Sequence, residues 1–151
     1  METEMETMKC EMPDKNPPCE EVVKILETHK KIAVVGCSPK AWRDSHKVAK
    51  YLLEKGYEVV PVNPGQREIL GKTCYKSLRD IPCGVEVVDI FLNPKRVPPV
   101  VEEAIEIDAK VVWMQLGVVD NVSAGKAREN GLQVVMNRCI KEEHRKMPPR
   151  K

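Results

Sequence analysis

Aromatic residues are scarce in this sequence, at 4% of 151 residues with a single Phe. Lys and Arg (25) nearly balance Asp and Glu (23), and the charges are spread without a basic stripe interleaved with aromatic side chains. Proteins that bind nucleic acid are typically marked by such a stripe or by a strong basic excess. A net charge of +2 therefore gives no support to nucleic acid as a partner.

Long hydrophobic runs are also missing. No apolar stretch approaches the length that crosses a bilayer, and the acidic start, rich in Met, Glu and Thr, is unlike a secretory signal. We therefore expect a cytoplasmic protein that does not bind membranes. The six Cys include no Cys-x-x-Cys pair, and the three His lack metal-ligand spacing, so we expect free thiols and no metal site.

A glycine-rich loop is absent as well. Residues 31–45 have the pattern of a strand, a polar loop and a helix start at Asp44, but Gly36 stands alone where the dinucleotide fingerprint has three glycines. The N-terminus of such a helix offers free amide groups and a positive dipole end to an anion. Lys40 and Arg43 in the loop add charge that can neutralise a pyrophosphate. The loop therefore predicts an anion site, but not the usual dinucleotide loop.

Apolar runs alternate with helical patterns along the middle of the chain. Five strands are expected, at Ile32–Val35, Glu58–Val62, Val85–Phe91, Val111–Met114 and Gln133–Met136. Helices are expected at Glu20–Lys30, Ser45–Lys55, from Pro94 to about Asp108 with the regular part starting near Pro98 and Pro99, Val122–Asn130 and Ile140–Lys146. Near-continuous apolar strands separated by helices favour a doubly wound α/β domain with a parallel five-stranded sheet. We place this domain at residues 18–147, between a flexible tail (1–17) and a frayed C-terminus (148–151).

Ligands of such sheets bind outside the carboxyl ends of the strands, so these ends are the candidate site. The second strand ends in Val-Pro-Val-Asn-Pro, without the acidic residue that holds the ribose of NAD. NAD is therefore disfavoured. Gln66 and Arg67 follow this strand end and leave NADP or a 3′-phosphorylated nucleotide open.

Some residues near these ends have more than one interpretation. Trp42 lies in a polar loop, where it either covers a nucleotide or makes a dimer contact. Trp113 is expected in the core, and Gln115 is a candidate for a polar contact with a ligand. Cys139 has no activating base close in sequence except His144, so we predict no catalytic role for it. A buried structural thiol is the first interpretation of Cys139, and contact with a ligand thiol is the second.

A set of motifs resembles one known family. The motifs are Val-Val-Gly-Cys-Ser-Pro (34–39) with Arg43 and Ser45, Val-Pro-Val-Asn-Pro-Gly (60–65), Leu70-Gly71 with Tyr75, Ile-Phe-Leu-Asn-Pro (90–94) with Val97-Pro-Pro99, Trp-Met-Gln-Leu-Gly (113–117) and Val-Met-Asn-Arg-Cys-Ile-Lys (135–141). From about Lys31 to Lys146 the chain resembles the stand-alone, YccU-like proteins of the Rossmann-like CoA-binding domain family. It is similar, more distantly, to the CoA-binding domain of the succinyl-CoA synthetase α subunit and of nucleoside-diphosphate-forming acyl-CoA synthetases.

The resemblance implies coenzyme A as the ligand and assigns roles to the strand ends. Around the pyrophosphate it implies Gly36, Ser38, Arg43 and Ser45, and around the adenine Val62, Asn63 and Pro64, with Gln66 or Arg67 near the 3′-phosphate. Beside the nucleotide it implies Phe91, Asn93 and Pro94, and along the pantetheine arm Gln115, Gly117, Asn137, Arg138 and Cys139. Lys40 and Cys37 complete the predicted set, with Cys37 in place of the small residue usual in the family.

We therefore expect a non-catalytic module that binds CoA or an acyl-CoA. No histidine lies in a phosphohistidine segment, and there is no room for an ATP-grasp domain, so the resemblance does not imply the ligase reaction. Two alternatives stay open: a thiol-redox protein that forms a mixed disulfide with CoA through Cys139 or Cys37, and an NADP-linked oxidoreductase. A homodimer and a separate ligase subunit are both compatible with the sequence as protein partners.

Overall fold

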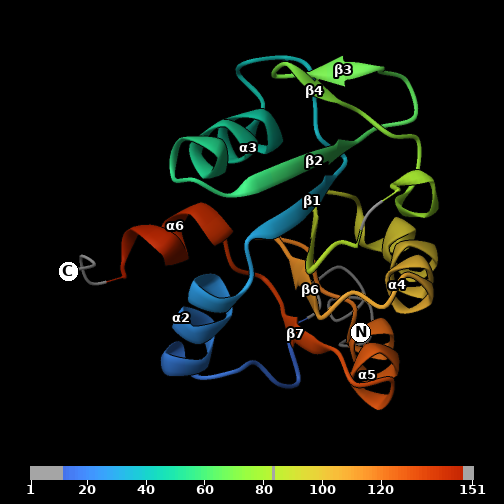
Figure 1. The fold of residues 1–151 in the computed structure, drawn as a ribbon. Helices are drawn as coiled ribbons and strands as arrows, with labels where there is room; N and C mark the ends of the chain where they lie inside the picture. The colour runs from blue at the N-terminus through green and yellow to red at the C-terminus, as the bar shows by residue number, and fades with distance from the viewer. Residues whose placement is uncertain (1–11, 83, 148–151) are drawn as a thin grey trace, which may run out of the picture.

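The structure is a computed structural model that describes residues 12–82 and 84–147, and its centre is a single parallel sheet (Figure 1). The strands are β1 (Lys31–Val35), β2 (Glu58–Val62), β5 (Val87–Ile90), β6 (Val111–Met114) and β7 (Gln133–Val135). They lie in the order β2-β1-β5-β6-β7, with every neighbouring pair parallel. The chain thus moves outward from β1 to β2 and then returns to the other side of β1. This reversal is the switch point of a doubly wound sheet, so the predicted fold class is confirmed.

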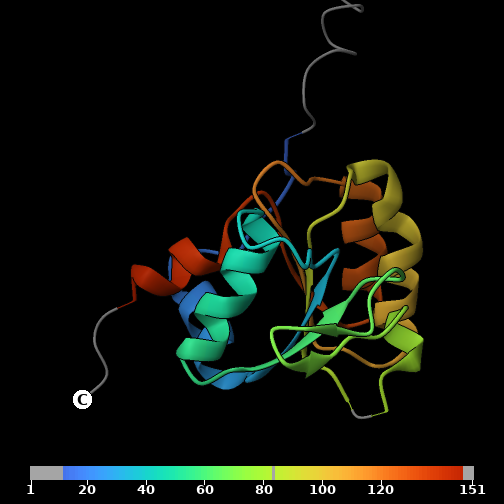
Figure 2. The same ribbon diagram turned by 90° about the horizontal axis from the view of Figure 1, so that it is seen from above.

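Helices cover both faces of this sheet (Figure 2). One face packs against α2 (Cys19–Thr28), α3 (Asp44–Glu54) and α6 (Ile140–Arg145), and the other against α4 (Val97–Glu106) and α5 (Asn121–Glu129). Alternate strand residues supply the two cores: Ile32 and Val34 of β1 face the first group of helices, and Ala33 and Val35 face the second. None of the helices in the described part of the chain is long and apolar enough to span a membrane.

The predicted strands and helices are confirmed, with ends that shift by a few residues. α4 begins at Val97, which places Pro98 and Pro99 in its first turn, where a missing amide hydrogen costs no helical hydrogen bond. A hairpin of β3 (Glu68–Ile69) and β4 (Lys72–Thr73) was not predicted. Its turn holds Leu70 at φ 55 and Gly71 at φ 73. Leu is an unusual residue for a positive φ, so the sequence lacked the signal of a hairpin turn.

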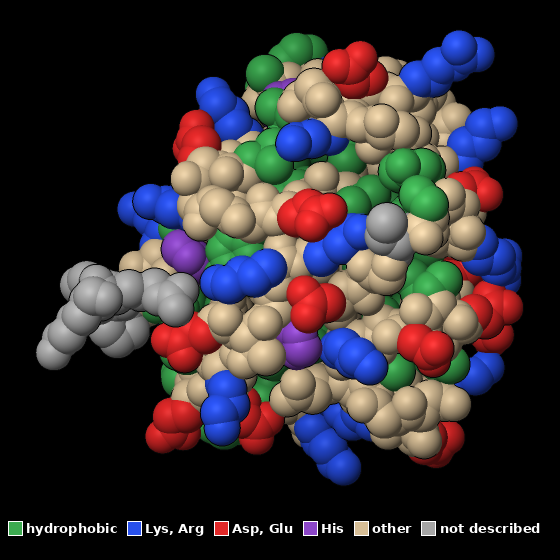
Figure 3. Space-filling view, in the orientation of Figure 1, with side chains coloured by type: hydrophobic (Ala, Val, Ile, Leu, Met, Phe, Trp, Pro, Cys, Tyr) green, Lys and Arg blue, Asp and Glu red, His purple; other side chains and the backbone are tan. Residues whose placement is uncertain are grey.

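Two short 3-10 helices, η1 (Leu78–Asp80) and η2 (Pro94–Arg96), lie between the main elements. The surface seen in Figure 3 mixes acidic and basic side chains, and the hydrophobic areas between them are small. On this face no large patch of one charge stands out.

The segment before α2 contacts the domain. Asn16 Nδ2 donates to the Met136 carbonyl at 2.8 Å, and Met136 N donates back to Asn16 Oδ1 at 2.8 Å. Asn121 of α5 donates to the Met12 carbonyl and accepts from Asp14 N, each at 2.7 Å. Of the predicted flexible tail, residues 12–16 thus lie hydrogen-bonded against α5 and the end of β7. Residues 1–11 and the predicted frayed C-terminus (148–151) lie outside the described residues.

Candidate functional site

The register of β1, β2 and β5 brings the starts of the three loops that follow these strands together at the carboxyl edge of the sheet. Val35, the last residue of β1, pairs with Val62 of β2 and with Ile90 of β5. The next residues along the chain, Gly36, Asn63 and Phe91, therefore leave the sheet side by side. Ile90 in turn pairs with Met114 of β6, so Gln115 follows next to Phe91.

Position 36 requires glycine because the loops after β1 and β5 lie so close together there. Its φ of +84° is in the left-handed region, and a Cβ at this position would lie 2.4 Å from the carbonyl oxygen of Phe91. Its amide donates to the Val62 carbonyl at 2.9 Å, which joins the ends of β1 and β2. Only glycine combines this backbone conformation with such a close neighbour.

The loop after Gly36 is folded back onto the first turn of α3. Ser38 N donates to Ser45 Oγ at 2.9 Å, Lys40 N donates to Ser38 Oγ at 3.1 Å, and His46 Nδ1 lies 2.9 Å from the Ser38 carbonyl. Ser45, predicted as a phosphate contact, thus uses its hydroxyl oxygen to hold the loop. No hydrogen bond within the described residues uses the amide hydrogens of Asp44 and Ser45, which stay available at this helix start.

The end of β2 holds the chain at Tyr75, just before Lys76, a residue that was not predicted to belong to the site. Asn63 Nδ2 donates to the Cys37 carbonyl and Asn63 Oδ1 accepts from Gly65 N, both at 2.8 Å, so this side chain joins two loops. Asn63 N donates to the Tyr75 carbonyl at 2.9 Å, and Tyr75 bridges to Val62. The chain therefore passes close to the β2 end just before it reaches Lys76.

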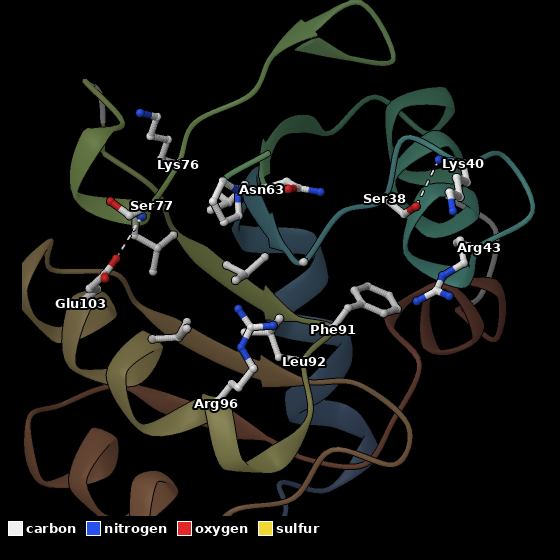
Figure 4. A pocket seen from close by; sticks show the side chains of 16 residues that line it. Ser38, Lys40, Arg43, Asn63, Lys76, Ser77, Phe91, Leu92, Arg96 and Glu103 are labelled. Carbon is white, nitrogen blue, oxygen red and sulfur yellow. Dashed lines mark hydrogen bonds between the residues drawn. The ribbon is translucent and has the colours of Figure 1, made fainter. Parts of the chain in front are cut away.

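A main cavity of about 540 Å³ opens at this edge (Figure 4). From the predicted set it is lined by Gly36, Ser38, Lys40, Arg43, Val62, Asn63, Pro64 and Phe91. Residues that were not predicted complete the lining: Val35, Lys76, Ser77, Leu78, Leu92, Arg96, Val100 and Glu103. Val35 is the last residue of β1, and the others come from η1, η2, α4 and the loops that precede η1 and η2. The only sequence signal for them was their place after the second and third strands.

Two smaller cavities continue along the edge toward β6. The second, of about 380 Å³, adds Ser45 and Gln115 from the predicted set, together with two exposed apolar side chains, Trp42 (68% exposed) and Leu116 (71%). The third, of about 300 Å³, adds Cys139 beside Gln115. Trp42 therefore lies at a cavity rim, where Lys40 Nζ is 5.6 Å from its ring centre.

The charges of the main cavity are not balanced by ion pairs. Lys40, Arg43, Lys76 and Arg96 line it, and none of them makes a salt bridge with another described residue. The one carboxylate of the lining, Glu103, accepts from Leu78 N at 3.0 Å and lies 3.5 Å from Arg79 Nη1. The cavity therefore has a surplus of positive charge.

Other predicted residues do not line these three cavities: Cys37, Gln66, Arg67, Asn93, Pro94, Gly117, Asn137 and Arg138. Several of them are engaged within the protein. Asn93 Oδ1 accepts from Lys95 N at 3.0 Å, and Gly117 N donates to Asn137 Oδ1 at 2.7 Å. Arg138 accepts through its carbonyl from Trp113 Nε1 at 2.8 Å, and its guanidinium is 3.8 Å from a neighbouring glutamate, Glu143. Trp113 is fully buried, as predicted.

The two thiols named in the redox alternative differ in their surroundings. Cys37 is fully buried, and burial, followed by the nearby Cys74 and Asp89, raises the pKa of its thiol to about 12. A thiol of this kind is inert because the thiolate is the reactive form. Cys37 therefore contributes its backbone to the loop and not a reactive thiol. Cys139 is half-buried and lines the third cavity, so the mixed-disulfide alternative would depend on Cys139.

A buried carboxyl lies directly below this edge. Asp89, in the middle of β5, is fully buried, and Gln115 Nε2 donates to its Oδ1 at 2.6 Å. Its Oδ2 has no hydrogen-bond partner among the described residues. Burial raises the pKa of Asp89 to about 8, because the charged form is poorly solvated there, while the bond from Gln115 acts in the opposite direction. Gln115, predicted as a ligand contact, is therefore held from below by Asp89.

Comparison with known proteins relates this chain to CoA-binding domains. The family model of the CoA binding domain matches residues 30–145. An uncharacterized protein of Bacillus subtilis (strain 168), YneT, is 40% identical over 129 residues, which cover 85% of this chain and 96% of YneT. The α subunit of the ADP-forming acetate–CoA ligase I of Pyrococcus furiosus is 39% identical over 89 residues, which make up only 19% of that subunit.

A solved structure supports the same relationship. A hypothetical protein from Pyrococcus horikoshii OT3 superposes with a TM-score of 0.85 at 48% sequence identity. The superposition covers 91% of this chain and 97% of that protein. The similarity thus extends over nearly the whole of a protein of similar size.

Proposed function

This chain belongs to the CoA-binding domain family, and from that premise we propose that it binds coenzyme A in the main cavity. The observation that carries the proposal is the cavity itself. It lies at the switch point of a doubly wound sheet, and its four cations have no described carboxylate partner. Nucleotides bind at such switch points, and unpaired cations in a hollow favour a ligand that carries phosphate.

The pyrophosphate is assigned to the loop between β1 and α3. Lys40 and Arg43 supply two positive charges there, and the amide hydrogens of Asp44 and Ser45 have no partner among the described residues. The positive end of the α3 dipole adds to their attraction for an anion. Arg43 can donate two parallel hydrogen bonds to phosphate oxygens, so we expect it to contribute most.

The adenosine is assigned to the middle of the main cavity. Apolar groups line the cavity, among them Val35, Val62, Pro64 and Leu92. They offer dispersion contacts to the faces of a flat base. Asn63 holds the two loops that shape this wall, and its amide is already engaged by Cys37 and Gly65. We therefore expect Asn63 to act by fixing the wall.

We propose binding without chemistry on the ligand. The lining of the main cavity contains neither His nor Cys, and Glu103 is engaged by Leu78 and Arg79. Ser38 Oγ accepts from Lys40 N. Ser77 Oγ donates at 3.2 Å to Asp80 Oδ2, an exposed carboxylate that does not line the cavity. We therefore assign neither hydroxyl a nucleophilic role. The proposed ligand is CoA or an acyl-CoA, held and released unchanged.

Isothermal titration calorimetry of the reduced protein with CoA tests the proposal, with NADP⁺ as a second ligand. We expect CoA to bind and NADP⁺ to bind more weakly or not at all. Arg43→Ala should weaken CoA binding by about tenfold to a hundredfold, the loss of a charge-assisted hydrogen bond of about 1–3 kcal/mol.

Arg145→Ala is the matched control for Arg43→Ala. Arg145 is an exposed arginine of α6 that pairs with Glu142 and lines none of the three cavities. Its removal should leave the affinity for CoA unchanged. Absence of CoA binding to the folded wild type would end the proposal, and equal affinities of the wild type and Arg43→Ala would remove Arg43 from the site.

A further inference from the structure

The main cavity has a second cationic end, and we infer that its Arg96, assisted by Lys76, binds the 3′-phosphate of the ligand. The inference rests on the proposed function and adds to it the feature of the ligand that the protein recognises. Arg96 is the last residue of η2, and Lys76 lies in the loop before η1. Neither belongs to the loop between β1 and α3 that is assigned to the pyrophosphate.

The two groups of cations are set apart within one cavity. In Figure 4, Lys40 and Arg43 lie on one side of Phe91, and Arg96 lies on the other with its guanidinium turned into the cavity. Lys76 stands at the far rim, above Ser77. Apolar side chains, among them Val62 and Leu92, also line this cavity. Such a cavity fits a ligand that carries two separate anionic groups and a flat group that packs on apolar side chains.

Coenzyme A has this chemistry. Its pyrophosphate and its 3′-phosphate are attached to different positions of the same ribose, and the adenine base extends from that ribose. Dephospho-CoA, which lacks the 3′-phosphate, has only the pyrophosphate. A cavity with one cationic end would accept the two compounds about equally, whereas a cavity with two such ends distinguishes them.

The ion pairs around α4 explain why Arg96 and Lys76 are free. Arg79 Nη2 lies 2.7 Å from Glu106 Oε1 and Arg79 Nη1 lies 3.5 Å from Glu103, and Lys126 of α5 pairs with Glu102 at 2.7 Å. These contacts engage the three glutamates of α4. None of these three glutamates is therefore left to pair with Arg96 or Lys76. A phosphate would be their counter-ion.

Arg67, the cation that the sequence suggested for the 3′-phosphate, lies elsewhere. It directly precedes the hairpin of β3 and β4, and neither Arg67 nor Gln66 lines any of the three cavities. The Arg67 carbonyl accepts from Cys74 N, which follows the hairpin, at 2.8 Å. The second cationic end is therefore assigned to Arg96 and Lys76 in place of Arg67.

Calorimetric titration with CoA and with dephospho-CoA tests the inference. The quantity of interest is the preference, the ratio of the dissociation constants of dephospho-CoA and CoA. We expect the wild type to prefer CoA by about tenfold or more, and Arg96→Ala to lower the preference by about tenfold, as the loss of one charge-assisted contact predicts. Lys76→Ala should lower it by about threefold, because Lys76 stands at the rim of the cavity, where solvent and salt screen its charge.

Lys95→Ala is the matched control for Arg96→Ala, because Lys95 is an exposed cation of the same 3-10 helix that lines none of the three cavities. It should keep the wild-type preference. Arg96 makes no side-chain cap for α4, so Arg96→Ala should keep the wild-type melting temperature.

The outcomes separate this inference from the proposed function. If the wild type binds both compounds equally, or if Arg67→Ala and not Arg96→Ala abolishes the preference, the inference is wrong and the CoA site stands. If the wild type binds neither compound, the proposed function fails and the inference fails with it.

Discussion

The carboxyl edge of the sheet has two halves that both carry polar residues after the strand ends but differ in structure. The loops that follow β1, β2 and β5, here called the open half, surround the main cavity and leave cations such as Arg43 without described ion-pair partners. The loops that follow β6 and β7, here called the closed half, bond to each other. In this half the Gly117 amide donates to Asn137 Oδ1, and the Arg138 carbonyl accepts from Trp113 Nε1.

The connectivity of the sheet explains this difference. The chain leaves β1 and β5 in opposite directions, so the loops at the switch point separate and leave a crevice. β6 and β7 are neighbours on the same side of the reversal, so their loops run close together and satisfy each other's polar groups. Polar residues at a strand end therefore indicate a site only where the neighbouring loops diverge.

The largest effect we expect is on the pH dependence of stability, and it comes from the hydrogen bond between Gln115 and Asp89, which links the two halves. Asp89 of β5 accepts from Gln115, which follows β6, and burial raises its pKa from 3.8 to about 8. The folded protein then holds a proton that the unfolded chain releases between these two pH values. The free energy of unfolding should therefore fall as the pH rises from about 4 to about 8, by at most about 1.4 kcal/mol per pH unit from this one group.

Asp89→Asn isolates this contribution, because the amide keeps the acceptor for Gln115 and cannot ionise. Denaturant unfolding of both proteins from pH 4 to pH 8 gives the measurement. The free energy of unfolding of the wild type minus that of Asp89→Asn should decrease across this range, by several kcal/mol in total. A difference that stays constant with pH would show that Asp89 keeps its ordinary pKa in the fold.

The second comparison uses one glycine from each half. Gly36 and Gly117 have nearly the same backbone angle, with φ of +84° and +86°. An added Cβ would lie 2.4 Å from the Phe91 carbonyl oxygen at Gly36, whereas it would meet nothing within 4 Å at Gly117. Gly117→Ala should therefore cost only the left-handed conformation, about 1 kcal/mol, and Gly36→Ala about 3 kcal/mol because the ends of β1 and β5 must also move apart.

Denaturant midpoints of the two variants measure this difference. Calorimetry should also show that Gly36→Ala loses CoA binding, since the displaced strand ends form the wall of the main cavity. Equal losses of stability in the two variants would mean that the contact between Gly36 and Phe91 relaxes at little cost.

The main strands and helices were predictable because their signals are local. Apolar runs such as Val111–Met114 and helix stops such as Gly56 are visible within a few residues. The hairpin of β3 and β4 was not predictable, because its turn places Leu70 at a positive φ against the preference of that residue.

The candidate site was predictable to the extent that it lies directly at strand ends. Gly36, Arg43 and Asn63 were found in this way, and they do surround the main cavity. Arg96 and Lys76 were missed because the turns of η2 and of the loop before η1 bring them there, and these turns have no periodic pattern. Gly117 and Asn137 were included because a single sequence does not show that their loops bond to each other.

The smallest expected effect concerns the carboxylates at two helix starts, one in each half. Asp44 lies in the first turn of α3 and lines the second cavity beside Arg43, and Asp120 is the N-cap of α5 in the closed half. If the pyrophosphate lies at the α3 start, the Asp44 carboxylate repels it through an exposed and screened contact. Asp44→Asn should therefore tighten CoA binding by about two- to threefold, and the gain should shrink at high salt.

The same substitution should act in the opposite direction on stability. A carboxylate in the first turn of a helix stabilises it by about 0.3–1 kcal/mol through the helix dipole, so Asp44→Asn should lower the free energy of unfolding by that amount. Asp120→Asn is the control, because the Asp120 carboxylate accepts from Ser123 Oγ at 2.8 Å and lines none of the three cavities. It should leave CoA affinity unchanged at every salt concentration. Tighter binding in both variants would reflect the net charge of the protein, and unchanged binding in both would place the pyrophosphate away from the α3 start.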